Sequence, residues 1–320
     1  KADPMATATL LLPARSRLAA AALPEDVARA LGRAARIDGP PGEPAQLQRH
    51  FDIPAAAAAG RWPVAALTRQ LDAGDAAGSA WLRADPAQMV PDMHGARMMG
   101  HGDTLGLDAA DALTLVQALQ PVFEGEGLHL DAPSPARWYL RVPLDLELPA
   151  FAAPDDVLGD DLFAHLPAGI AGRRWRALLT EAQVTLHAHP LNATRAQQGQ
   201  PPINSVWFWG AGTLPARVTT AHAQVRSPDA LLRALAMAAG VQIDGEQSVD
   251  ALVDLRRLRS VQQLANEAIR PLLAAVQRGE LSRLVLDFQD GVCFDIERSQ
   301  RWRFWKKPVQ LRADAAAATV

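Results

Sequence analysis

The chain has 320 residues and a mass of 34.3 kDa, enough for one large domain or two smaller ones. Hydrophobic residues make up 49% and charged residues 21%, which excludes a disordered chain, a collagen and a coiled coil. The net charge of −3 excludes a dominant polyanion-binding surface, so we expect no nucleic-acid partner. Because no apolar run is long enough for a membrane span or a signal peptide, we expect no membrane association and a cytoplasmic location.

Cysteine and lysine are both scarce. Cys293 is the single cysteine, so no intrachain disulfide can form, and its apolar neighbours favour a buried, unreactive thiol. Lysine occurs only at positions 1, 306 and 307, and the other basic residues are arginines. An anion site in this chain would therefore be built from arginine, asparagine, histidine and backbone amides.

The predicted elements alternate between strands and helices. In chain order we expect a strand at 9–12, a helix at 24–36, a loop at 38–46, a strand at 81–83, a helix at 108–120 with Asp108 as N-cap, a strand at 138–142, a helix at 174–188, a strand at 205–209, and helices at 228–239 and 260–277. Strands at 281–288 and 292–297 flank Asp290-Gly291, a hairpin signal. The alternation predicts an α/β fold, a mixed sheet flanked by helices with an antiparallel end.

Three segments are richer in polar residues than packing requires. In the first, Arg83 and Asp85 share one face of a strand, and a guanidinium is a planar fork that fits a carboxylate or a phosphate. The alternative is a surface ion pair between the two side chains.

The second polar segment contains two carboxylates and two imidazoles within twelve residues, at Asp92, His94, His101 and Asp103. These side chains are ligand types for divalent metals, so they are candidate metal ligands. Their spacing does not define a coordination shell, and the alternative is a solvated glycine-rich loop.

The third segment, residues 186–212, combines the end of a helix, a Gly/Pro loop, an apolar strand and a Gly-x-Gly turn. Backbone N–H groups at such a turn can approach an oxyanion, and ligands of open α/β sheets bind at the carboxyl ends of strands. Together with the first segment, the candidate ligand-binding residues are Arg83, Asp85, His187, His189, Asn192, Arg195, Asn204, Gly210 and Gly212. The alternative is that the tryptophans at 207 and 209 are core, the histidines cap a helix and the glycines only form a turn.

A basic and aromatic stretch lies near the end of the sequence. It consists of Arg298, Arg301, Arg303, Lys306 and Lys307, interleaved with Trp302, Phe304 and Trp305. It favours either a contact with a protein partner or a C-terminal strand with a solvated basic face. The alanine-rich residues 313–320 are expected to be a disordered tail.

Four stretches resemble known proteins: WLRADP at 81–86, PDMHGARMM at 91–99, RWYLRVP at 137–143 and LHAHPLNATRAQQGQPPINSVWFWGAG at 186–212. They are similar to a proteobacterial family of RpfE-type regulatory proteins, also described as cofactor-independent phosphoglycerate mutase-like. The resemblance implies a distantly alkaline-phosphatase-like α/β core with an inserted smaller lobe. We therefore expect a core at 6–78 and 203–312 and an inserted substrate-lobe-like region at 79–202.

Mutase activity on that fold implies a serine nucleophile and two divalent metals held by aspartate and histidine. Here Leu12 is followed by Pro13-Ala14-Arg15, and no histidine follows His222. We therefore expect a pseudoenzyme with a degenerate metal core and no assigned cofactor, which binds a small anionic ligand such as a phosphometabolite, or a regulatory protein partner. Two alternatives remain open: a metal-dependent phosphomutase or phosphatase with relocated ligands, and an interaction protein that uses the basic and aromatic stretch.

Overall fold

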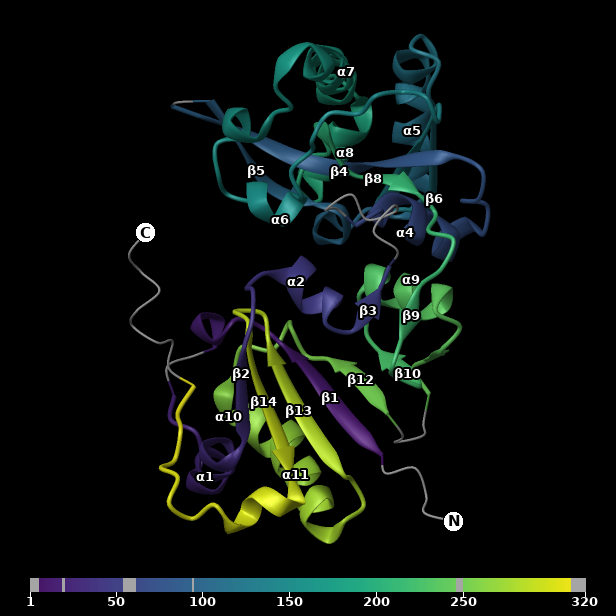
Figure 1. Ribbon diagram of the computed structural model, residues 1–320. Helices are drawn as coiled ribbons and strands as arrows, with labels where there is room; N and C mark the ends of the chain where they lie inside the picture. Colours follow the sequence, from purple (N-terminus) through teal and green to yellow (C-terminus); the bar gives the residue numbers. More distant parts are fainter. Residues whose placement is uncertain (1–5, 19–20, 54–61, 94, 246–249, 312–320) are drawn as a thin grey trace. The chain divides into compact units, whose positions relative to one another are not determined.

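The computed structural model describes residues 6–18, 21–53, 62–93, 95–245 and 250–311 (Figure 1). The chain divides into two compact units: unit 1 comprises residues 1–53 and 217–320, and unit 2 comprises residues 54–216. None of the helices in the described part of the chain is both long and apolar enough to cross a membrane. The tail expected at 313–320, like His94, lies outside the described residues.

Unit 1 is built on a mixed sheet in the order β11-β10-β12-β1-β13-β14-β2. Its strands are β1 (Thr7–Leu12), β2 (Ala35–Asp38), β10 (Gln224–Arg226), β11 (Gln242–Ile243), β12 (Ala251–Asp254), β13 (Arg283–Phe288) and β14 (Val292–Glu297), with a separate ladder of β3 (Phe51–Asp52) and β9 (Thr219–Thr220). Its helices are α1 (Glu25–Arg33), α2 (Glu43–Gln48), α9 (Ala230–Ala238), α10 (Val261–Gln263) and α11 (Arg270–Arg278), with short 3-10 turns at Arg15–Arg17 and Arg298–Trp302.

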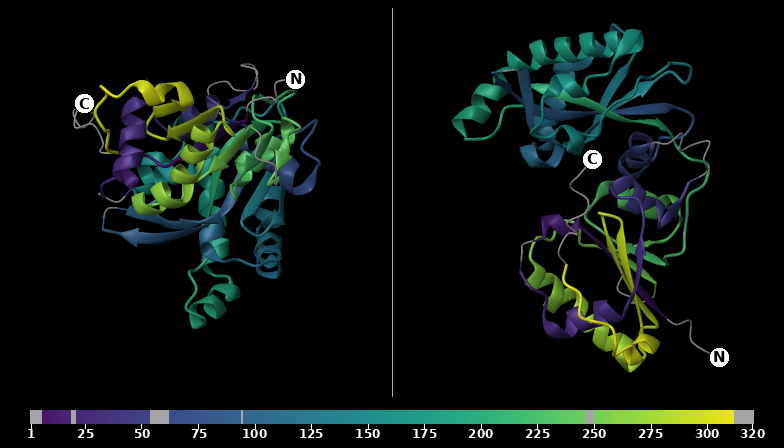
Figure 2. Two further views of the ribbon diagram at one scale, coloured as in Figure 1. Left: turned by 90° about the horizontal axis from the view of Figure 1, so that it is seen from below. Right: turned by 60° about the vertical axis from the view of Figure 1, so that its left-hand side comes forward.

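The neighbours from β11 to β13 are parallel, and the hairpin strand β14 and the edge strand β2 add antiparallel pairs. Leu10 and Leu12 of the central β1 are buried in one core with Val27 of α1 and Val276 of α11. Figure 2 shows purple and yellow-green helices of unit 1 lying beside its sheet. The predicted mixed α/β sheet with an antiparallel end is therefore confirmed.

Unit 2 is an antiparallel sheet in which β5, β7 and β8 all pair with the long strand β4. Its strands are β4 (Ala80–Asp92), β5 (Gly95–His101), β6 (His129–Ser134), β7 (Arg137–Val142) and β8 (Ser205–Thr213), and its helices are α4 (Val64–Ala73), α5 (Ala109–Glu124), α6 (Pro154–Val157), α7 (Gly169–His187) and α8 (Pro190–Gln197), with 3-10 turns at Gly102–Leu105 and Leu162–His165.

Alternation along β4 sends side chains to two different layers of unit 2. Leu82 and Ala84 join the large core that includes α5 and α7, whereas Trp81 packs with Ala65 of α4 and Tyr139 of β7. Arg83 and Asp85 have the same parity as Trp81 and lie in the α4 layer. The register of β4 therefore places a charged pair inside the fold.

Several predicted boundaries differ from the structure. Residues 203–216 belong to unit 2, because β8 pairs along β4, and unit 2 begins at 54 rather than 79. The segment 92–103, for which a solvated glycine-rich loop is the alternative to a metal site, contains β5, which forms a hairpin with β4. The helix expected at 24–36 ends at Arg33, because Ala35–Asp38 pairs with β14 as the edge strand.

Two further segments depart locally from the expected pattern. The loop expected at 38–46 contains the start of α2, which places a proline, Pro44, in its first turn. The helix expected at 260–277 is interrupted by a π-helical turn at Leu264–Ile269, directly before Pro271. Proline has no N–H to continue the α-helical hydrogen bonding, so the change of helix type falls where a bond would be missing.

Gly291 in the β13–β14 turn gives a test of the fold. Its φ is +90°, and a Cβ there would lie 2.1 Å from the carbonyl oxygen of Gly39. We expect Gly291→Ala to lower the free energy of unfolding by about 2–4 kcal/mol, since left-handed strain and a backbone clash act together. Gly240 has φ +69°, and nothing lies within 4 Å of the place that a Cβ would take there, so Gly240→Ala is the control for strain alone. The free energy of unfolding is measured in urea. If both variants lose the same amount, the predicted clash of the Gly291→Ala side chain with the Gly39 carbonyl is contradicted.

Candidate functional site

The predicted pair of Arg83 and Asp85 exists, but it is buried rather than on the surface, with 5% and 1% exposure. Arg83 Nε and Nη2 donate to the two Asp85 oxygens over 2.7 and 2.8 Å. Trp209 Nε1 donates to Asp85 Oδ2 over 2.7 Å, and the guanidinium carbon lies 5.2 Å from the ring centroids of Tyr139 and Trp209. Both charges are therefore already satisfied inside unit 2.

The same layer holds a second ion-pair group. Tyr139 donates its hydroxyl to Asp72 over 2.5 Å, and Arg137 binds both oxygens of Asp72 over 2.7 Å. Burial raises the pKa of Tyr139 well above its usual value, although the nearby charge of Arg83 opposes this. Because Asp72 lies on α4 and both of its partners lie on β7, these contacts hold α4 to the sheet.

Asn192, Arg195 and Asn204 bind backbone groups instead of forming an open anion site. Asn192 bonds both the N–H and the C=O of Ile203, at 2.8 and 2.9 Å. Asn204 does the same to Met89, at 2.8 Å each way. Arg195 is buried, and its guanidinium donates to the carbonyls of Pro201 and Leu105. These side chains therefore hold the segment 186–204 together and attach it to the backbone at Met89 and Leu105.

The remaining candidates lie at the ends of these elements. His187 is exposed in the last turn of α7, and His189 is the N-cap of α8, whose ring accepts a hydrogen bond from the N–H of Leu191. Gly210 and Gly212 lie within β8, so the expected turn after the strand is wrong. A Cβ at Gly210 would lie 2.9 Å from Val64, and one at Gly212 would lie 2.6 Å from Pro63, so close packing on α4 requires both glycines.

The candidates fall into two groups along β4. Arg83 is at one end with Asp85 and Gly210, and Met89, which holds Asn204, is six positions further along the strand. At a rise of about 3.3 Å per residue this separates the groups by about 20 Å. A single pocket lined by all the candidates is therefore not formed.

The candidate metal ligands that the structure describes are also apart. Asp92 pairs with Arg97, whose hydrogen bond holds the carboxyl pKa below its usual range. His101 lies 3.7 Å from Asp155, and Asp103 is in the 3-10 turn that follows β5. Among the described residues, no three histidine, cysteine or acidic side chains are grouped to hold a metal ion.

Unit 2 does have an open pocket of about 560 Å³, and none of the candidate residues lines it. Its polar lining includes Ser79, Glu124, His129 and Arg141, the last two being cross-strand partners on β6 and β7. Arg141 Nε donates to the Ser79 hydroxyl over 2.9 Å. Arg141 itself lines the pocket, and within the described ranges its terminal nitrogens form no ion pair with a carboxylate.

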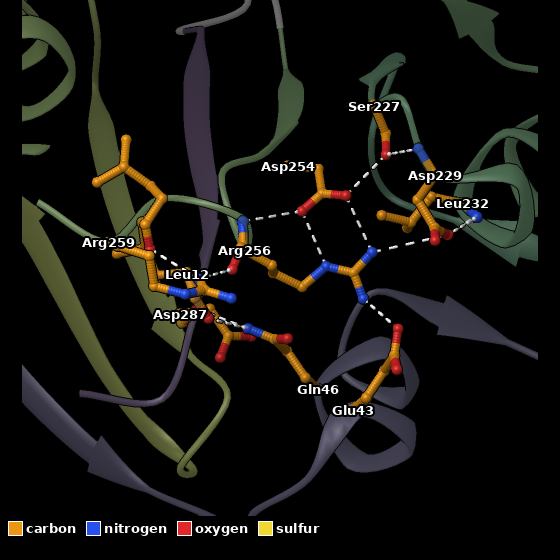
Figure 3. A network of polar contacts seen from close by, with 11 residues as sticks. Leu12, Glu43, Gln46, Ser227, Asp229, Leu232, Asp254, Arg256, Arg259 and Asp287 are labelled. Carbon is orange, nitrogen blue, oxygen red and sulfur yellow. Dashed lines mark hydrogen bonds and ion pairs between the residues drawn. The ribbon is translucent and has the colours of Figure 1, made fainter. Parts of the chain in front are cut away.

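Unit 1 has its polar cluster at the carboxyl ends of its parallel strands, where ligands of α/β sheets usually bind (Figure 3). Arg256, which follows β12, donates to both oxygens of Asp254 over 2.8 and 2.9 Å. Its Nη1 also binds Glu43 of α2, and its Nη2 lies 3.6 Å from Asp229. A guanidinium is therefore surrounded by three carboxylates, and Ser227 completes the set by donating to Asp254 over 2.7 Å.

The charges of this cluster stabilise one another. Burial alone would raise the pKa of Asp254, but the hydrogen bonds and charge of Arg256 outweigh it and hold the pKa below the usual range. Arg256 is in turn more strongly protonated than an exposed arginine, because its carboxylate neighbours outweigh its desolvation. The carboxylates stay ionised and paired with a fixed cation.

A second cluster surrounds Asp287 at the end of β13. Arg49 binds both of its oxygens, at 3.0 and 2.6 Å, and His50 Nε2 lies 2.7 Å from Oδ2. His50 Nδ1 lies 3.0 Å from Nε2 of His222. Burial, with the nearby His50, lowers the pKa of His222 to about 4, so the His222 ring is neutral near neutral pH.

The resemblance implies two divalent metals, and the residues at this edge do not fit them. Asp254 and Glu43 are held by Arg256, Asp287 by Arg49 and Asp290 by Arg15. The strand β1 ends in Leu12, whose carbonyl accepts from Gln46 over 3.1 Å. A metal ion would have to displace a guanidinium from its carboxylates. The donor chemistry present is that of ion pairs rather than of a metal centre.

The sequence reasoning missed these two clusters. Asp254 and Asp287 end or nearly end strands, and the rule that parallel strands present functional groups at their carboxyl ends would have found them. Cys293, in contrast, is buried in β14, and burial raises its pKa to about 12, as an unreactive thiol requires.

Comparison with known proteins finds similarity to phosphoglycerate mutases. No protein-family model matches the chain. It is 31% identical over 90 residues to a probable 2,3-bisphosphoglycerate-independent phosphoglycerate mutase of Geobacter sulfurreducens, which covers 28% of this chain and 22% of that protein. It is 37% identical over 62 residues to the corresponding mutase of Methanosarcina mazei, covering 19% of this chain and 16% of that one. The matched stretches thus span about a fifth of the curated relatives.

Among solved structures, a cofactor-independent phosphoglycerate mutase from Thermoplasma acidophilum aligns with 91% of this chain and 89% of its own, at 16% identity and a TM-score of 0.43. The similarity to mutases is partial in sequence. The mixed α/β architecture is established by the strand order of the chain itself.

The buried pair on β4 gives a stability test. We expect Arg83→Met to cost about 3–5 kcal/mol, because Asp85 would be left as a buried charge with no cation. The double variant Arg83→Met with Asp85→Leu should cost less than the single change, since neither charge remains. The control is Arg278→Ala in an exposed pair, expected to change stability by less than about 0.5 kcal/mol. The free energy of unfolding is measured by chemical denaturation for each variant. A double variant that is less stable than Arg83→Met would contradict this explanation.

The lowered pKa of His222 gives a pH test. Because the folded pKa is about 4 and an unfolded histidine has about 6.5, the unfolded chain binds the proton more readily between these values. Stability is therefore complete above pH 6.5 and falls as the pH drops towards 4, by on the order of 3 kcal/mol. His222→Gln should flatten this window, and Asp254 and Asp287, with lowered pKa values, act at still lower pH. An unchanged pH profile in the variant would refute the assignment.

Proposed function

We propose that this chain is a phosphoglycerate mutase-like protein that binds a small anion and does not carry out two-metal phosphoryl transfer. The observation that carries the proposal is the position of Arg256 among Asp254, Glu43 and Asp229 at the carboxyl ends of the parallel strands. A metal ion there would neutralise the carboxylates and stabilise attacking and leaving oxygens. Arg256 supplies the neutralising charge but has no open coordination position for a reacting oxygen.

The pocket of unit 2 is the binding site that we propose for the anion. Arg141 offers a planar fork for a phosphate or carboxylate, and His129 and Ser79 are further donors beside it. Glu124 also lines the pocket, and its carboxylate favours a ligand that carries a hydroxyl donor as well as the anionic group. Phosphoglycerates carry both a hydroxyl and anionic groups, and they are the compounds after which the similar mutases are named.

In this proposal, five of the residues predicted to bind the ligand have a structural role in unit 2 instead. They are Arg83, Asp85, Asn192, Arg195 and Asn204. We further propose that the chain has a regulatory role, like that of the RpfE-type proteins that its sequence resembles. In that role, ligand binding would signal the level of a phosphometabolite instead of converting it, as expected of a pseudoenzyme.

Titration calorimetry of the full chain with 3-phosphoglycerate tests the proposal. We expect binding that is unaffected by prior EDTA treatment and at least tenfold weaker in Arg141→Ala, because the charged donors are lost. Arg173, exposed on α7, gives the control variant Arg173→Ala, which should bind like the unaltered chain. No interconversion of 3- and 2-phosphoglycerate is expected with or without Mn²⁺.

Two results would reject it. Absence of binding at millimolar ligand, or equal binding by Arg141→Ala, would remove the proposed site. Stoichiometric bound Mn²⁺ or Zn²⁺, with turnover that Asp254→Asn abolishes, would instead establish the alternative of a metal-dependent phosphomutase or phosphatase.

A further inference from the structure

The basic and aromatic stretch, residues 298–311, is a fixed surface feature of unit 1 rather than a loose end. Its 3-10 turn is closed by Gln300, whose side chain donates to the carbonyl of Asp295 over 3.1 Å. Further along, the N–H of Val309 donates to the carbonyl of Ala28 in α1 over 2.9 Å, and Leu311 is buried. The stretch is thus tied to the fold at both of its ends.

Its middle is held to α1 through backbone. A Cβ at Gly32 would lie 2.0 Å from the carbonyl oxygen of Lys307, so the absence of a side chain at Gly32 lets the two segments touch. Arg303 Nη1 donates to the carbonyl of Arg33 over 3.1 Å. The stretch thus lies against α1 through the backbone of Lys307 and the side chain of Arg303, while the neighbouring aromatic side chains are exposed.

The outward side chains are large aromatics. Trp302, Phe304 and Trp305 are 61%, 70% and 71% exposed. Phe304 and Trp305 pack edge to face with centroids 6.1 Å apart, and Arg301 lies over the Trp302 ring at 4.8 Å. Exposing three neighbouring aromatic side chains to water is unfavourable in free energy. Such a surface is typical of a site that binds a membrane or another protein.

The charge of the stretch has one sign. It carries five basic residues and no acidic residue between 298 and 311, although the whole chain has a net charge of −3. Two of the three lysines in the chain, Lys306 and Lys307, lie in this stretch. Exposed aromatics between cations are the combination that interfacial membrane segments use, with rings at the headgroup level and cations at anionic lipids.

We propose that residues 298–307 bind the surface of an anionic lipid bilayer, with Trp302, Phe304 and Trp305 entering the interface and the basic side chains contacting headgroups. All three rings are more than half exposed, which suits insertion into a flat interface. Single-stranded nucleic acid needs open ring faces for stacking, and Arg301 already covers one face of Trp302. The sequence expectation of no membrane association rested on the absence of a span, which peripheral binding does not need.

Flotation of the full chain with vesicles tests the proposal. Vesicles of phosphatidylcholine with 30% phosphatidylglycerol should carry the chain upward at low salt, and pure phosphatidylcholine vesicles should bind at least tenfold less. Trp302→Ala with Phe304→Ala and Trp305→Ala should lower binding at least tenfold. Lys306→Glu with Lys307→Glu should lower it about 25-fold or more, since each cation near an anionic surface contributes about fivefold.

Matched variants separate this surface from general effects. Phe163 is 60% exposed in unit 2, and Arg173 and Arg257 are exposed arginines elsewhere. Phe163→Ala, and Arg173→Glu with Arg257→Glu, should float like the unaltered chain, and circular dichroism should show all variants folded. The proposal is overturned if the chain does not prefer anionic vesicles or if the aromatic and lysine variants float like the controls. It is equally overturned if oligouridylate or an oligoglutamate peptide binds these residues while vesicles do not.

Discussion

A guanidinium keeps its charge when it is taken out of water, so a buried arginine is stable only where carboxylates or carbonyls surround it. This constraint acts throughout a chain that has almost no lysine. Arg83 is buried against Asp85, Arg69 against Asp75 and Asp131, and Arg195 against backbone carbonyls. Arg69 links α4 to β6 through Asp131. Arg83 holds Asp85 where it accepts a hydrogen bond from Trp209, which links β4 to β8.

The same constraint gives the carboxyl edge of unit 1 its character. Asp254, Glu43 and Asp229 would repel one another at close range unless a cation lay among them. A divalent ion and a guanidinium both meet that electrostatic requirement, but they differ chemically. A metal ion exchanges ligands and polarises a bound oxygen, whereas Arg256 donates hydrogen bonds in fixed directions and stays attached to the chain. A side chain can therefore satisfy the charges of such a site without supplying the chemistry of a metal.

Local patterns predicted the α/β class, the Asp108 N-cap and the β13–β14 hairpin, because each depends on residues adjacent in sequence. They did not predict that Gly210 and Gly212 lie within a strand, since what requires those glycines is the approach of Pro63 and Val64. The sequence predicts Asn192 and Asn204 as ligand-binding residues, whereas their side chains bind the backbones of Ile203 and Met89. An asparagine that clamps backbone and one that binds a ligand have the same sequence signal, and only the fold distinguishes them.

The short ladder of β3 and β9 determines how unit 2 is connected to unit 1 along the chain. Asp52 pairs with Thr219, so the chain leaves unit 1 and returns to it at adjacent points of an antiparallel ribbon, with Cα atoms about 5 Å apart. An insertion whose ends are neighbours adds little closure entropy to its host, however long it is. Unit 1 therefore has the connectivity of a host in which residues 54–216 take the place of a hairpin loop, so a change in the length of unit 2 does not require a change in the strand order of the host sheet.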